Sequence, residues 1–272
     1  MIVELTYHCT MGCIHCMSDC KGDHSHMSVI TLRDVLAFTE KNGIRAVSFS
    51  GGEIFEHPQI VECLEIIAEY ETRVRNTPAS LVPIAFITNG RKLSTDKFLQ
   101  EAYKGIRSKI GKEKCLLQVT DDPRFYPESL SEKQKYQLKR LDAIIDRVPS
   151  DPVEPTKCLY PQGRALKNFG APYWRTIAPK CINARLAPMQ IAGCTFAKLN
   201  EALAYAGKLC TPTIAPDGGI KLGESALCPS VASIYDTDKD SMDKIRNFKC
   251  LQCEISIDRF RKSNPVLASL LF

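Results

Sequence analysis

The sequence predicts an α/β fold whose parallel strands form a partial (β/α)6 barrel, and three observations support this prediction. Apolar runs of strand length alternate with helical stretches over most of the chain. Such alternation implies parallel strands joined by right-handed crossovers. Glycine-rich and polar motifs directly follow several strands, where the loops of a parallel barrel carry its chemistry. After Lys208 the pattern changes to short β runs among Pro, Gly, Asp and Cys, which predicts a small second domain.

Local start and stop signals justify each element in turn. Thr31 is a helix N-cap and Gly43 a helix end, while Gly51–Gly52, Asn89–Gly90 and Asp121–Asp122 close the second, third and fourth strands. In chain order, the expected elements are a strand at Ile2–Tyr7, a helix at Thr31–Asn42, a strand at Ala46–Ser50, a helix at Pro58–Tyr70, a strand at Ile84–Thr88, a helix at Ser94–Ile110, a strand at Leu116–Thr120, a helix at Ser131–Asp146, a fifth strand near Ala143–Val148 or just before Cys158, a sixth strand at Pro188–Ala192 and a helix at Phe196–Gly207. A boundary between Cys194 and Cys210 divides the chain into residues 1–195, the barrel, and 196–272, a linker helix with the small domain.

Composition narrows the class of protein. The net charge of +5 is mild, and its densest basic run (Lys133–Arg140) falls on a predicted helix, so a solvated helix face is favoured over nucleic-acid binding. No apolar stretch approaches the roughly 20 residues of a membrane span, and the N-terminus lacks the pattern of a secretion signal. We therefore expect a cytoplasmic protein without a membrane partner. In such a reducing compartment its thirteen cysteines indicate metal ligation rather than disulfide bonding.

Three of these cysteines directly follow the first strand. Cys9, Cys13 and Cys16 have the spacing C-x3-C-x2-C. A [4Fe–4S] cluster normally takes four thiolates, so three leave one iron open to a small molecule. Zinc is the alternative, although zinc sites favour two C-x2-C pairs. Cys20 is interpreted as a spare thiol, because a fourth thiolate would occupy the open iron.

The spacing of this loop resembles the signature of the radical S-adenosylmethionine (SAM) superfamily. The resemblance implies a TIM-like partial barrel in which SAM chelates the open iron. Reductive cleavage of SAM then yields a 5′-deoxyadenosyl radical that abstracts hydrogen from a substrate. It also implies a reductase partner, such as flavodoxin or ferredoxin. His15 takes the position of an aromatic residue that packs near the adenine in relatives.

Further motifs extend this resemblance along the barrel. Gly51-Gly52-Glu53 resembles the family's GGE motif, in which backbone carbonyls and the glutamate accept hydrogen bonds from the SAM ammonium. Glycine also allows close approach of the backbone to a ligand. By the same resemblance, four further residues are expected to contact SAM, with a plain turn or a surface salt bridge as alternatives: Thr88, Asn89, Gln118 and Arg164.

The C-terminal cysteines resemble the twitch domain, a shortened SPASM domain. Cys210 and Cys228 are separated by a hairpin signal at Pro216–Gly219, and Cys250-x2-Cys253 follows. Four cysteines suffice for one auxiliary [4Fe–4S] cluster, and zinc is the alternative. The cysteine layout is similar to that of 2-deoxy-scyllo-inosamine dehydrogenase. Of the other cysteines, Cys181 and Cys194 are possible substitutes in this ligand set, and Cys63 and Cys115 are expected in the core.

Several polar residues have two interpretations each. His8, His15, His24 and His26 could form a metal site, but a polar loop is favoured. Asp121, Asp122 and Arg124 could contact substrate or only form a turn.

These features predict an enzyme that removes hydrogen from a small-molecule or peptide substrate, with the auxiliary cluster accepting the last electron. The alternatives are a peptide-modifying maturase that forms thioether or carbon–carbon crosslinks, and a non-enzymatic zinc or iron–sulfur regulator. The sequence does not indicate which residue is the catalytic base.

Overall fold

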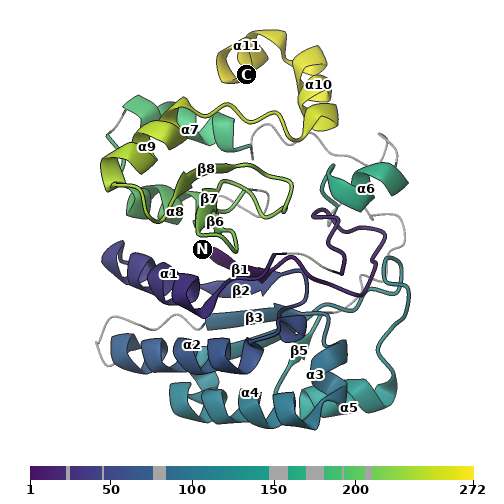
Figure 1. Cartoon of the computed structure of the whole chain (residues 1–272). Helices are drawn as coiled ribbons and strands as arrows, with labels where there is room; N and C mark the ends of the chain where they lie inside the picture. Colours follow the sequence, from purple (N-terminus) through teal and green to yellow (C-terminus); the bar gives the residue numbers. More distant parts are fainter. Residues whose placement is uncertain are drawn as a thin grey trace.

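A single mixed sheet organises the chain (Figure 1). The computed structural model describes residues 1–22, 25–44, 46–75, 84–146, 159–169, 181–191, 193–205 and 210–272. Eight strands lie in the order β5-β4-β3-β2-β1-β6-β7-β8. In this order, β5, β4, β3, β2, β1 and β6 are parallel to one another, whereas β7 is antiparallel to β6 and β8 is antiparallel to β7. The strands are β1 (Ile2–Thr6), β2 (Ser48–Gly51), β3 (Ile84–Thr88), β4 (Cys115–Val119), β5 (Ile144–Ile145), β6 (Thr213–Ile214), β7 (Gly219–Lys221) and β8 (Ser230–Ser233).

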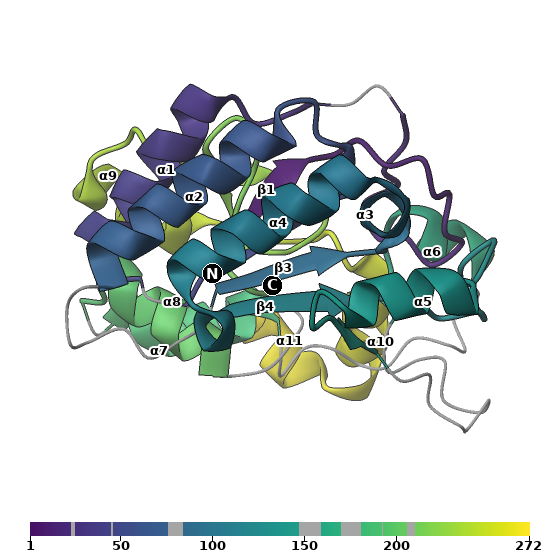
Figure 2. The same cartoon turned by 90° about the horizontal axis from the view of Figure 1, so that it is seen from below.

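The long helices α1, α2 and α4 cover one face of this sheet (Figure 2). Figure 2 shows α1, α2 and α4 side by side along one face, with α7, α10 and α11 on the opposite side. The helices are α1 (Val29–Lys41), α2 (Ile60–Arg75), α3 (Arg91–Thr95), α4 (Lys97–Ile110), α5 (Glu132–Lys139), α6 (Gly163–Asn168), α7 (Ile182–Ile191), α8 (Phe196–Tyr205), α9 (Asp238–Asn247), α10 (Glu254–Ser263) and α11 (Pro265–Leu271), with short 3-10 turns at Ile54–Glu56 and Lys112–Lys114.

Alternation along the strands separates a helix-covered face from a concave face. Val3, Phe49, Phe86 and Leu117 are almost fully buried, and the Phe49 and Phe86 rings stack at 5.4 Å. Because side chains alternate in a strand, the residues between them point the other way. This second face carries Glu4, Ser50, Ile87 and Gln118, and the first three of these residues line a cavity.

The predicted (β/α) alternation is confirmed up to the fifth strand, and two expectations beyond it are wrong. The helix predicted over Ser131–Asp146 ends at Lys139, and β5 takes Ile144–Ile145. Of the sixth strand predicted at Pro188–Ala192, residues 188–191 are instead the end of α7, and Ala192 lies outside the described residues. The periodicity of a short apolar run does not distinguish a strand from a helix. The Ala, Arg, Leu, Met and Gln residues of α7 are good helix formers. The alternative position before Cys158 lies outside the described residues.

The sixth parallel strand comes from farther along the chain and leaves the sheet open. β6 pairs with β1 through Ile2–Thr213 and Val3–Ile214 rather than adding to the β5 edge. The predicted hairpin is confirmed, because β6 and β7 are antiparallel and joined across Ala215–Gly218. Strands β6, β7 and β8 thus extend the sheet formed by β1 to β5. The predicted domain boundary at residue 195 stays a prediction.

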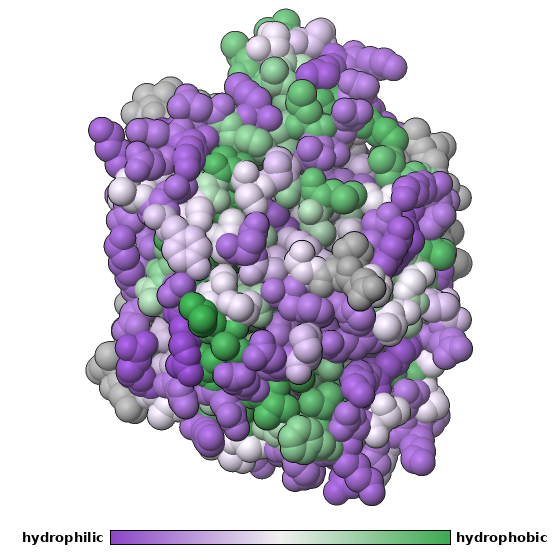
Figure 3. All heavy atoms as spheres, in the orientation of Figure 1, coloured by the Kyte–Doolittle hydropathy of each residue, from purple (hydrophilic) through white to green (hydrophobic). Residues whose placement is uncertain are grey.

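The surface is mostly hydrophilic on the face seen in Figure 3. Apolar side chains gather at its top, over α10 and α11, where Val266 and Leu270 are 78% and 71% exposed. None of the helices in the described part of the chain is long and apolar enough to cross a membrane.

Candidate active site

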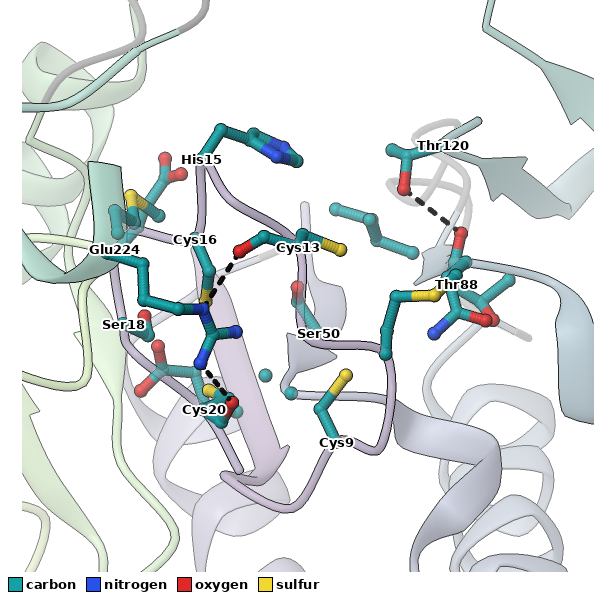
Figure 4. A pocket seen from close by; sticks show the side chains of 18 of the residues that line it. Cys9, Cys13, His15, Cys16, Ser18, Cys20, Ser50, Thr88, Thr120 and Glu224 are labelled. Atoms are coloured by element: carbon teal, nitrogen blue, oxygen red, sulfur yellow. Dashed lines mark hydrogen bonds between the residues drawn. The ribbon is translucent and has the colours of Figure 1, made fainter. Parts of the chain in front are cut away.

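The loop that leaves β1 lines a cavity of about 310 Å³ at the carboxyl ends of the parallel strands. Cys9, Cys13 and Cys16 contribute to its wall. The segment from Cys9 to Cys20 is called the cysteine loop below. The ends of β2 and β3 form the opposite side through Ser50–Gly52 and Thr88–Asn89. Figure 4 shows the cysteines on one side of this space and Thr88 and Thr120 on the other. The cavity therefore joins motifs that are far apart in sequence.

The thiols of the cysteine loop are close enough to influence one another. Burial, with a smaller contribution from neighbouring thiolates, raises the pKa of Cys9 to about 11 and that of Cys13 to about 12. Cys20 also lines the cavity and is buried. Its hydrogen bond to Cys16 lowers the pKa of Cys16. The loop thus places several thiols around one cavity, and their deprotonation needs a compensating positive charge, as a metal cluster would provide.

Gly51 and Gly52 are required by the fold as well as by any ligand. Gly52 N donates to the carbonyl of Thr6 at 2.7 Å, and Glu53 N donates to that of His8 at 2.8 Å. A Cβ on Gly52 would lie 2.2 Å from the His8 carbonyl oxygen, and one on Gly51 would lie 2.1 Å from that of Thr6. The two glycines therefore let the end of β2 contact the backbone that leads into the cysteine loop.

The carboxylate of Glu53 joins the ends of β2 and β3 and does not line the cavity. It accepts hydrogen bonds from Phe55 N at 3.1 Å, Thr88 Oγ1 at 2.5 Å and Asn89 N at 2.7 Å. Glu53 is 1% exposed, and burial outweighs these three donors and raises its pKa to about 7. In this structure Glu53 acts as an anchor for Thr88 and Asn89.

The predicted contact residues on β3 and β4 separate into two groups. Thr88 and Asn89 line the cavity, together with Thr120 at the end of β4. Gln118 does not line it, because its amide donates to the carboxylate of Asp146 at 3.2 Å. Asp121 also points elsewhere and accepts hydrogen bonds from Arg91 and Leu130 N.

An aromatic wall that the sequence did not predict closes one side of the cavity. The His15 ring lies 4.9 Å from that of Phe125 and 5.3 Å from that of Tyr126. Tyr126 lines the cavity and shares a 2.6 Å hydrogen bond with Thr120. Burial lowers the pKa of His15 to about 4, and its buried Nδ1 has no hydrogen-bond partner among the described residues. The His15 imidazole is therefore neutral and has one ring nitrogen without a described partner. The Phe-Tyr pair directly after the β4 turn was the available signal.

The floor of the cavity holds a buried charged triad that sequence analysis also missed. Glu4 is 2% exposed, and its Oε2 accepts from Tyr7 Oη at 2.7 Å and from Lys221 Nζ at 2.5 Å. Lys221 also donates to Tyr7 Oη at 2.9 Å and to the Ser225 carbonyl at 2.8 Å. Glu4 lines the cavity, and no described residue donates to its Oε1. Burial raises the pKa of Glu4. The signal in the sequence was a charged residue inside each of two apolar strands.

Arg164 lines the cavity and fastens α6 to the cysteine loop. Its Nε donates to the Cys13 carbonyl at 2.8 Å, and Nη1 donates to Asp19 Oδ1 and the Cys20 carbonyl, both at 2.9 Å. Nη2 has no acceptor among the described residues. The predicted carboxylate-binding fork is therefore partly used by the loop, with one nitrogen remaining.

The four C-terminal cysteines line a second, smaller cavity of about 30 Å³. Cys210, Cys228 and the Cys250–Cys253 pair come from three separate segments of the chain, and burial raises the pKa of all four thiols. Among the described side chains no His, Cys, Asp or Glu group is drawn together tightly enough to hold a metal ion as it stands. The chemistry of the donor set still fits a thiolate-ligated cluster.

Of the two further cysteines that the sequence offers as ligands here, Cys181 lies near this second cavity and Cys194 does not. Cys181 is buried close enough that its charge raises the pKa of Cys210, Cys250 and Cys253. Cys194 interacts instead with Lys198 and Arg246. Cys63 and Cys115 are buried in the core, as predicted.

The other histidines of the N-terminal segment do not line the large cavity. The His8 ring lies 5.7 Å from His26, and the His26 ring lies 5.2 Å from His57. His8 also pairs with Glu56 at 3.5 Å. His24 lies outside the described residues. Asp122 forms an ion pair with Arg124 within its own turn.

Comparison with known proteins gives one family and several distant structures. Residues 3–145, more than half of the chain, match the sequence profile of the radical SAM superfamily. No curated protein matches the chain. Among solved structures, native anSMEcpe with bound AdoMet is 12% identical over 91% of this chain and 80% of that chain, with a TM-score of 0.49. SuiB of Streptococcus suis bound to S-adenosylmethionine is 15% identical over 94% and 70%, with a TM-score of 0.41. SuiB bound to its precursor peptide SuiA is 14% identical over 94% and 69%, with a TM-score of 0.38.

Proposed function

This chain belongs to the radical SAM superfamily, and from that premise we propose that it is an oxidising enzyme with two iron–sulfur clusters. Membership implies an enzyme that uses a [4Fe–4S] cluster and SAM. When bound, SAM and its cluster supply the radical that removes a hydrogen atom from the substrate, and a second cluster takes up the last electron. The remaining steps are assigned to residues of this chain.

The large cavity is proposed as the SAM site, with Cys9, Cys13 and Cys16 as the cluster ligands. The observation that carries this proposal is that these three thiols and the Ser50–Gly52 backbone line one cavity. Cys20 lines it too, but its hydrogen bond to Cys16 gives it a separate role as a neighbour of a ligand. Three thiolates leave the open iron on which SAM chemistry depends.

Several side chains are proposed to orient SAM within the cavity. Arg164 Nη2 and Asn89 are suited to the amino-acid part of SAM, because both line the cavity and both are fixed by other contacts. His15 and Tyr126 are suited to the adenine, since both rings line the cavity and His15 has an unpaired ring nitrogen. Glu53 is proposed to act indirectly by holding Thr88 and Asn89 in place.

Glu4 is proposed as the proton acceptor of the oxidation. Glu4 lines the cavity, and Tyr7 and Lys221 hold its Oε2, while no described residue donates to its Oε1. After removal of a hydrogen atom from a carbon bearing O–H or N–H, loss of the O–H or N–H proton to Glu4 and transfer of the remaining electron to the second cluster would give C=O or C=N. The substrate is thus a small molecule or peptide with an oxidisable alcohol or amine. Flavodoxin or ferredoxin is the proposed electron donor.

The second cluster is proposed at Cys210, Cys228, Cys250 and Cys253, as in a twitch domain. Their shared cavity supports this, and Met17 and Tyr160 form a wall common to both cavities. Four thiolates would complete a [4Fe–4S] cluster and leave no open iron, which suits electron transfer.

A cysteine comparison within one loop tests the SAM site. In anaerobically reconstituted protein reduced with dithionite, we expect Cys16→Ala to abolish 5′-deoxyadenosine formation, as measured by chromatography. The matched variant Cys20→Ala should retain it, because Cys20 is not a ligand. Equal SAM cleavage in both variants would contradict the assignment.

A second pair of variants tests the auxiliary site. We expect Cys250→Ala with Cys253→Ala to lose iron but to keep forming 5′-deoxyadenosine, whereas Cys194→Ala should lose neither. Metal analysis that finds zinc in place of iron at the second site would refute the two-cluster proposal.

A further inference from the structure

The amide of Gln162 contacts two of the four cysteines around the small cavity. Its Nε2 lies 3.6 Å from Cys253 Sγ and 3.8 Å from Cys228 Sγ, within hydrogen-bonding range for sulfur. Gln162 is 6% exposed, so water does not compete strongly for this amide. Cys228 follows β7 and Cys253 precedes α10, so a single side chain reaches sulfurs from two distant parts of the chain.

The backbone next to Gln162 is fixed from the opposite side by the cysteine loop. Gly163 has φ +57°, and a Cβ there would lie 2.5 Å from the carbonyl oxygen of Met17 and 2.6 Å from that of Cys16. Arg164 N donates to the Cys16 carbonyl at 2.9 Å. Figure 1 shows α6, which begins at Gly163, beside the cysteine loop. The backbone beside Gln162 is therefore held against the loop of the first cluster site, next to the sulfurs that the amide contacts.

An amide that donates to cluster sulfurs changes the reduction potential of the cluster. Reduction adds negative charge to the cluster, and an N–H donor stabilises that charge, so it raises the potential. Lys221 is a positive group near these thiols, because its charge lowers the pKa of Cys228. Glu4 and Tyr7 hold Lys221 in place, so its effect on the cluster should be equal in wild type and in every Gln162 variant.

From these contacts we infer that Gln162 is a positioning residue that raises the reduction potential of the auxiliary cluster. The inference rests on the proposed function, since it requires a cluster at Cys210, Cys228, Cys250 and Cys253. Gln162 contacts two sulfurs of the auxiliary site, and the adjacent Gly163 and Arg164 contact the cysteine loop, so this short segment touches both sites.

A redox titration of the full chain tests this role without a substrate. Anaerobically reconstituted wild type, Gln162→Leu and Gln162→Glu would be titrated with dithionite in the presence of SAM, and both clusters followed by electron paramagnetic resonance. We expect Gln162→Leu to keep its iron and to shift the reduction equilibrium of the auxiliary cluster roughly tenfold, which is about 59 mV more negative for a one-electron couple. Gln162→Glu should be lower still, because it places a negative charge beside the sulfurs. The control Gln59→Leu, at an exposed glutamine that donates to Glu62, should match wild type.

The outcomes separate this inference from the proposed function. If the wild type binds only one cluster, the proposed auxiliary site fails. If two clusters bind and both Gln162 variants titrate as wild type does, the inference alone is overturned. If Gln162→Leu loses iron, the comparison of Gln162→Glu with wild type decides, and an unchanged or higher potential refutes the inference.

Discussion

Replacing Gly52 with alanine should separate the end of β2 from the cysteine loop. The added Cβ would lie 2.2 Å from the His8 carbonyl oxygen, so the two backbones must part by about 1 Å to reach ordinary contact. That movement lengthens the hydrogen bonds from Gly52 N to Thr6 and from Glu53 N to His8. Overpacking costs about 1–3 kcal/mol and an unmade buried hydrogen bond costs about as much. We expect Gly52→Ala to lose about 3 kcal/mol of unfolding free energy.

The matched control is Gly105→Ala. Gly105 lies inside α4, where a Cβ would meet nothing within 4 Å. Alanine there should stabilise the helix by about 0.5–1 kcal/mol. Urea unfolding of both variants under anaerobic conditions measures the difference, and we expect the Gly52→Ala midpoint to fall by about 1 M. Iron bound after reconstitution should also fall in Gly52→Ala, because His8 leads directly into Cys9.

Two results would refute this reasoning. Equal urea midpoints for Gly52→Ala and Gly105→Ala would mean that β2 and the cysteine loop are not in close contact. A normal midpoint with lost SAM binding would mean that Gly52 serves the ligand alone.

Three more variants test the anchors around the cavity. Burial raises the pKa of Glu53 to about 7, so the folded protein keeps a proton that the unfolded chain releases at lower pH. The unfolding free energy of wild type relative to Glu53→Gln should therefore fall as the pH rises from 5 to 8, by at most roughly 3 kcal/mol. A pH-independent difference between the two in urea unfolding would contradict this. Lys221→Met leaves the carboxylate of Glu4 buried without its cation and should cost about 3–5 kcal/mol in the same assay, whereas a loss below 1 kcal/mol would show that the pair is not buried. Arg164→Lys removes the planar fork that binds the Cys13 carbonyl, so we expect weaker SAM binding in calorimetry at unchanged helix content, and wild-type affinity would exclude Arg164 from the site.

Much of the site could be predicted because its motifs are short and contiguous. The spacing of Cys9, Cys13 and Cys16 is a local property of the chain, and each motif follows a strand whose apolar run is itself local. Because parallel strands end at one edge of a sheet, motifs after β1, β2 and β3 had to meet there. Only the direction of the side chains was open, and Glu53 points between strands rather than into the cavity.

The tertiary structure decided whatever depends on partners distant in sequence. β6 lies beside β1 and not at the β5 edge, because strand pairing is chosen by long-range packing that no local pattern records. The Glu4–Lys221 pair joins residues on β1 and β7, and the Gln162 amide meets sulfurs of two other segments. Local propensity and motif spacing determine which elements form and which end of each carries chemistry. The free energy of burying charges and amides among distant elements determines which of those groups finally touch.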